Sequence, residues 1–144
     1  MKTPASIAGH PIHPMLVAVP IGLWLFSFVC DIVFAFFGGG ENWRIVALYT
    51  LVGGIVGALA AAIPGLIDLL SLERALRRIA VAHMSINLTV VALYVANAWL
   101  RLSGASETTT LVLSAVAVAA LVVSGWLGGK MVYEHGVAVG ERAA

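Results

Sequence analysis

The sequence predicts an all-α fold, an integral membrane four-helix bundle with up-down-up-down topology. Of the 144 residues, 61% are hydrophobic and 10% are charged, against about 25% charged in an ordinary soluble domain. A water-soluble fold of this size could not hide so much apolar surface. Four stretches have the length, roughly 20 residues, that crosses about 30 Å of hydrocarbon as a helix. The connections between them are short, which makes neighbouring helices antiparallel and puts both chain ends on one side of the membrane.

The four predicted spans belong to a single domain and cover residues 14–37, 45–70, 79–100 and 111–132. Charged residues are absent from nearly all of the second, third and fourth spans. The first span contains Asp31, one or two turns from its end. A carboxylate at that depth needs a partner, and Asn42 or Arg44 on the same side would serve.

The basic residues are distributed unequally between the two sides of the membrane. We call the side that holds both termini side A and the opposite side side B. Side A collects Lys2, Arg74, Arg77, Arg78, Lys130 and Arg142, whereas side B has Arg44 and Arg101. Because cytoplasmic loops carry an excess of Lys and Arg, side A is predicted to face the cytoplasm.

Small residues mark places where helices can approach closely. Gly53 and Gly57 form a GxxxG arrangement in the second span, and residues 124–129 at the end of the fourth are also rich in glycine. We interpret these glycines as sites of tight packing within the bundle, with a homodimer interface as the less favoured alternative. The tryptophans mostly fall near span ends, as interfacial anchors do; they are Trp24, Trp43, Trp99 and Trp126.

Several function classes are excluded. The net charge of +1 and the lack of clustered Lys and Arg leave no basis for nucleic-acid binding. Cys30 is the single cysteine, so the chain has no internal disulfide and no CxxC metal pair. Motifs for serine hydrolases, zinc proteases and nucleotide-binding loops are missing, and no catalytic residue can be assigned.

All four histidines fall on side A of the predicted topology. His10 and His13 precede the first span, His83 lies about one turn into the third, and His135 follows the fourth. Asp68 and Glu134 are on the same side. The chemistry of the protein is therefore expected at this histidine cluster.

His10 and His13 each precede a proline, Pro11 and Pro14. Proline biases the residue before it towards extended or polyproline conformation, in which residues three apart point the same way at roughly 9 Å separation. We expect a rigid segment that presents both imidazoles to one site. Two histidines so placed could reach one small metal ion, but they could not be the two axial ligands of one haem, which approach from opposite faces.

The third span carries a polar stripe on one helical face: His83, Asn87, Tyr94, Asn97 and Arg101. Polar groups are costly in hydrocarbon, so the stripe is predicted to face the bundle interior. Asn87, one turn deeper than His83, could hydrogen-bond the imidazole or a bound group. Asp68 could accept the second N–H of a ligating histidine or pair with Arg74 or Arg77.

Several short segments form a specific combination. They are residues 9–14 and 20–22, residues 64–68, His83 with Asn87, and residues 124–129 and 133–137. In these segments the sequence resembles a bacterial membrane-protein family known as domain of unknown function 2231. The resemblance covers nearly the whole chain, although Lys130 stands where an acidic residue is often expected. It implies a four-helix membrane protein, and relatives joined to Rieske or cytochrome domains imply electron transfer. We expect the protein in a bacterial inner membrane.

Three hypotheses about function remain open. The first is a haem b protein for electron transfer, with His83 as one axial ligand and His13 or His135 as the other; it implies a redox partner protein. The second is a zinc, copper, iron or nickel site built from His10, His13, His83 and His135, with Asp68 or Glu134 beside them. The third is a cofactor-free membrane subunit or proton conductor, which predicts a continuously polar interior from His83 to Arg101.

Overall fold

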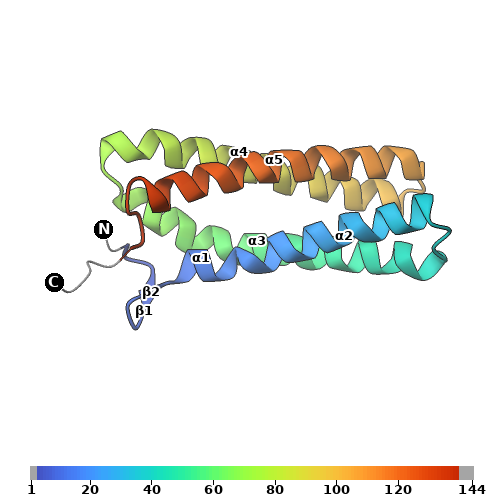
Figure 1. Cartoon of the computed structure of the whole chain (residues 1–144), viewed down its shortest axis with the longest axis horizontal. Helices are drawn as coiled ribbons and strands as arrows, with labels where there is room; N and C mark the ends of the chain where they lie inside the picture. The colour runs from blue at the N-terminus through green and yellow to red at the C-terminus, as the bar shows by residue number, and fades with distance from the viewer. Residues whose placement is uncertain (1–2, 140–144) are drawn as a thin grey trace.

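The computed structural model describes residues 3–139 and shows an antiparallel helical bundle (Figure 1). Four of its helical segments are long and apolar enough to cross a membrane, so the predicted fold class is confirmed. The last three helices extend one to five residues beyond each end of their predicted spans, whereas the first span begins two residues earlier and ends one residue earlier than predicted. Lys2 and Arg142, which contributed to the predicted orientation, lie outside the described residues. The elements are β1 (Ser6–Ile7), β2 (His10–Pro11), α1 (Ile12–Leu16), α2 (Ala18–Phe36), α3 (Glu41–Ser71), α4 (Arg74–Leu102) and α5 (Glu107–Tyr133).

The helices form two closely packed pairs, with α2 and α3 in one layer and α4 and α5 in the other (Figure 1). The glycines of α3 allow the close approach within the first pair. A methyl group at Gly57 would lie 3.1 Å from Val19 Cγ1, and one at Gly54 would overlap the Trp24 indole. Because α2 already covers this face of α3, the GxxxG arrangement packs within the chain and is not available to a second copy.

An apolar cluster in the middle of the bundle joins the two layers. Its members come from all four long helices and are Trp24, Leu51, Val90, Tyr94, Ala117 and Leu121. Trp24 stacks on Tyr94 with ring centres 4.4 Å apart, and its Nε1 donates to the Leu51 carbonyl at 3.1 Å. Trp24 is therefore a core residue, only 2% exposed, and the prediction that it anchors the membrane interface was wrong.

The chain before α1 forms a small hairpin and not the predicted polyproline segment. Strands β1 and β2 pair Ile7 with His10, and the two-residue turn between them has positive φ at Ala8 and Gly9, as a type I′ turn requires. His13 is helical, in α1, with Pro14 in the first turn where its missing N–H costs nothing. His10 and His13 thus belong to different elements.

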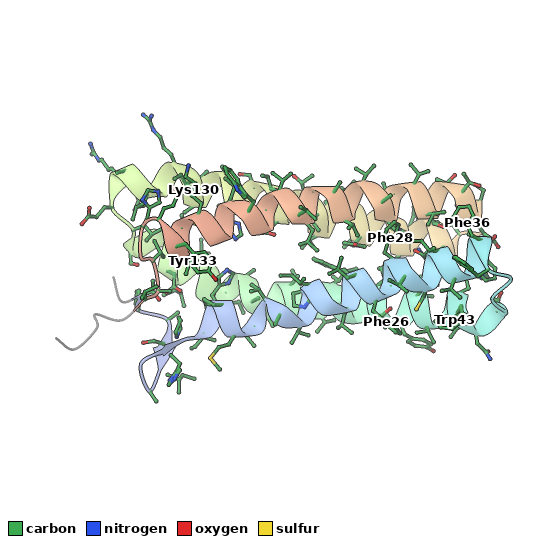
Figure 2. All side chains as sticks on the ribbon, in the orientation of Figure 1. Phe26, Phe28, Phe36, Trp43, Lys130 and Tyr133 are labelled. Atoms are coloured by element: carbon green, nitrogen blue, oxygen red, sulfur yellow. The ribbon has the colours of Figure 1, made fainter. Side chains whose placement is uncertain are left out.

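The outer surface of the bundle is apolar along the length of the helices. Phe26 points away from the bundle (Figure 2), and Leu59 and Val122 are likewise exposed. Exposed aliphatic and aromatic side chains on every long helix are suited to lipid and would be a liability in water. The polar side chains that matter for function are consequently those turned inward.

Candidate functional site

The structure brings together two of the four histidines, His13 from α1 and His83 from α4. Their ring centres are 6.4 Å apart and the ring planes are nearly perpendicular, at 88°. Both side chains are half-buried. The prediction that His83 faces the interior is confirmed, and its neighbour comes from the opposite helical layer.

His13 is held in a groove on α3. Its Nδ1 bonds the carbonyl oxygen of Ala61 at 2.8 Å, and a methyl group on Gly65, one turn further along, would lie 2.7 Å from the same nitrogen. Pro64 precedes this glycine inside the helix and removes one backbone hydrogen bond beside the groove. Pro64 and Gly65 therefore make room for the His13 ring, since Pro64 has no backbone N–H and Gly65 has no side chain.

His83 is held on α5 in the same way. Its Nδ1 bonds the carbonyl oxygen of Ser124 at 2.9 Å, with the Ser124 hydroxyl at 3.0 Å. A methyl group on Gly128, again one turn along, would lie 3.2 Å from His83 Cε1. In both layers a histidine thus bonds a helix carbonyl and packs against the glycine four residues later.

These contacts fix which ring nitrogen carries the proton. A carbonyl oxygen only accepts hydrogen bonds, so Nδ1 of His13 and Nδ1 of His83 are the donors, and each Nε2 of a neutral ring keeps its lone pair. At His83 the Asn87 side-chain amide donates to Nε2 at 3.0 Å. This is the hydrogen bond to the imidazole that was one of the two roles predicted for Asn87. A histidine that binds a metal is oriented in this manner, by donating its other N–H to a carbonyl or carboxylate.

The remaining predicted site residues do not join this pair. The Asp68 carboxylate accepts the backbone N–H of Ala5 at 3.0 Å, so it ties the hairpin to α3 and neither supports His83 nor pairs with an arginine. His10 is exposed, with Nδ1 3.0 Å from the Ala8 carbonyl, and His135 is exposed beyond the end of α5. Glu134 pairs with Lys130 at 3.6 Å.

The predicted metal set of His10, His13, His83, His135 and Asp68 is therefore not assembled. Among residues 3–139, no three His, Cys, Asp or Glu side chains are grouped closely enough to hold a metal ion. These residues were predicted on one side of the membrane, but a shared side does not make them neighbours.

Side B holds a buried ion pair that the sequence analysis missed. Asp31 binds Arg101 through two bonds, Oδ1 to Nη1 at 2.8 Å and Oδ2 to Nη2 at 2.6 Å, and both side chains are more than 90% buried. Asn97 and Ser114 complete the network, at 2.8 Å from Arg101 Nε and 3.1 Å from Asp31 Oδ2. Arg44, one of the expected partners, instead pairs with Glu41 at 2.9 Å. A cavity of about 90 Å³ reaches the pair from this end.

The polar stripe of α4 is interrupted. Between Asn87 and Asn97 lies the apolar cluster, with Val90 and Tyr94 fully buried in it. The Tyr94 hydroxyl has no hydrogen-bond partner in the described part of the chain. The expected continuous polar interior from His83 to Arg101 is thus absent, because large apolar side chains from every long helix meet at this level.

Comparison with protein families matches residues 9–141 to the family described as "Predicted membrane protein (DUF2231)". The chain belongs to this family. No match was found among curated proteins or among solved structures. Membership of the DUF2231 family agrees with the four apolar helices, and the match extends from the hairpin glycine, Gly9, to beyond α5.

Proposed function

We propose that this protein is a small membrane redox protein that binds haem b between His13 and His83. The observation that supports this function is the pairing of two inward-facing imidazoles from opposite helical layers, each held by its Nδ1 to a helix carbonyl. Of the two candidates for the second axial ligand, the geometry favours His13 over His135.

The spacing of the rings is compatible with one metal held by both. A metal–imidazole bond of about 2.0–2.1 Å plus roughly 1 Å from nitrogen to ring centre, on each side, gives roughly 6 Å between ring centres. The separation of the His13 and His83 ring centres is 6.4 Å. The two helical layers would each supply one histidine to hold the haem.

The number of ligands favours haem over a bare ion. A zinc or copper ion bound by protein alone needs three or four side-chain ligands, and residues 3–139 offer no such group. Haem supplies four equatorial nitrogens and a one-electron couple of its own, so it needs only two histidines from the chain. Ligation by two histidines fills both axial positions and is suited to electron transfer.

The chain's own residues would orient the ligands and exclude water. The Ala61 and Ser124 carbonyls hold the two rings and raise the basicity of each Nε2. The apolar cluster centred on Val90 and Leu51 closes the interior towards side B. Electrons would therefore be exchanged at side A, where a redox partner protein would dock.

We further propose that side A faces the cytoplasm at a bacterial inner membrane. Among the described residues, Arg74, Arg77, Arg78 and Lys130 lie on this side. Side B has Arg44 and Arg101. The excess of Lys and Arg on side A supports this orientation.

The test is the absorption spectrum of protein expressed with ample haem and purified in detergent. A Soret band that shifts on reduction is expected, and H13A and H83A should each lose the spectrum of two-histidine ligation. H10A and H135A are the matched controls and should keep it. A colourless wild-type protein would contradict the proposal. Elemental analysis of the same samples tests the alternative, because a bare metal at this site would give a protein without a Soret band whose metal is lost in H13A and H83A.

A further inference from the structure

The lone-pair nitrogen of His83 is already engaged within its own helix. Because Nδ1 donates to the Ser124 carbonyl, Nε2 is the acceptor, and the Asn87 amide donates to it at 3.0 Å. His83 and Asn87 are four residues apart and share one face of α4. The nitrogen required for ligation is therefore capped by a neighbouring side chain.

The other histidine has no such cap. His13 is held at Nδ1 by the Ala61 carbonyl, and within residues 3–139 nothing hydrogen-bonds its Nε2. The two otherwise equivalent histidines thus differ in one respect, which is the availability of the ligating nitrogen. Asn87 is the origin of this difference.

Asn87 and His83 also depend on each other. The contact with His83 is the one hydrogen bond made by the Asn87 side chain in the described region, and Asn87 is half-buried at the depth of a membrane span. A buried amide or imidazole without a partner is costly. The pair therefore stabilises the bundle when no other ligand engages His83.

We propose that Asn87 is a reversible cap that controls access to His83, an inference that rests on the proposed haem site. Nε2 of His13 is available at once, whereas ligation by His83 requires the Asn87 amide to rotate away. Because side-chain rotation is far faster than haem binding, the cap acts on the affinity of the site and not on the rate of assembly. Exchanging one ordinary hydrogen bond changes the binding equilibrium about fivefold.

The experiment is a titration of haem-free protein in detergent with ferric haem b. N87A should bind haem about fivefold more tightly than the wild-type protein. Ser85→Ala is the matched control, because Ser85 is exposed on the same helix and should behave as wild type. Asn87→Leu keeps the side-chain volume and provides a second variant should N87A fail to accumulate.

A thermal-unfolding measurement separates a cap from a merely structural residue. The cap predicts that N87A lowers the midpoint of the haem-free protein while haem affinity rises. A structural role would lower both. Wild-type protein that binds haem through two histidines with an affinity unchanged in N87A would overturn the cap alone. Wild-type protein that binds no haem would overturn the proposed function and the cap together.

Discussion

Replacing Gly65 with alanine should displace His13 from its groove. The added methyl group would lie 2.7 Å from His13 Nδ1 and 2.9 Å from Cε1, whereas carbon contacts are optimal at about 3.5–4.0 Å. The ring must therefore move by about 1 Å. Such a shift breaks the 2.8 Å bond to the Ala61 carbonyl and carries Nε2 away from His83.

The cost to folding is expected to be smaller than the cost to the site. Losing a partly buried hydrogen bond costs about 1–3 kcal/mol, and alanine in place of glycine within a helix returns about 0.5–1 kcal/mol. G65A should therefore fold, with a free energy of unfolding reduced by up to about 2 kcal/mol. Its haem spectrum should nevertheless lose the signature of two axial histidines.

Three further glycines calibrate this prediction. Gly128 stands in the corresponding place on α5, but its added methyl group would lie 3.2 Å from His83, so G128A should have a smaller effect. Gly22 and Gly125 have nothing within 4 Å, and G22A and G125A are the controls for helix propensity alone. The assay is the Soret spectrum together with thermal unfolding in detergent. A G65A protein with the spectrum of G22A would refute the reasoning.

Three other substitutions test the remainder of the bundle by thermal unfolding or proteolysis in detergent. Asp31→Ala should lower the free energy of unfolding by about 3–5 kcal/mol, because it leaves Arg101 buried without a counter-charge. The double variant Asp31→Leu, Arg101→Met should lose less stability. An equal loss in the single and double variants would argue against this ion pair. Asp68→Ala should release the amino-terminal hairpin and expose it to protease, with a loss of about 1–3 kcal/mol; protection equal to wild type would show that the contact is unimportant. Gly54→Ala should destabilise the bundle because the methyl group overlaps the buried Trp24 indole, and a variant as stable as wild type would contradict that packing.

The sequence was sufficient for the four helices and for the inward face of α4. Long apolar stretches predicted the four spans, and the spacing of His83 and Asn87 on one face correctly placed both inward. Hydropathy also placed all four histidines at one end. Depth along the membrane is what such patterns encode, because the bilayer itself imposes it.

Which neighbour each side chain meets was not encoded in the same way. His10 and His135 were predicted on the same side as His13 yet do not meet it, and Asp31 meets Arg101 from α4 where Asn42 or Arg44 was expected. The hairpin turn was also missed. Its first central residue, Ala8, adopts positive φ, whereas asparagine, aspartate or glycine is normally found at that position of such a turn. The pairing of His13 with a backbone carbonyl of α3 leaves no trace in a residue pattern.

The most direct test of the account is the electron paramagnetic resonance spectrum of the oxidised, haem-loaded protein. Two axial imidazoles make ferric haem low-spin, and perpendicular rings, as His13 and His83 have at 88°, leave two iron d orbitals nearly degenerate. The account predicts a strongly anisotropic low-spin signal that H13A converts to high spin and H135A leaves unchanged. A high-spin signal in the wild-type protein, or a low-spin signal that survives in H13A, would contradict it.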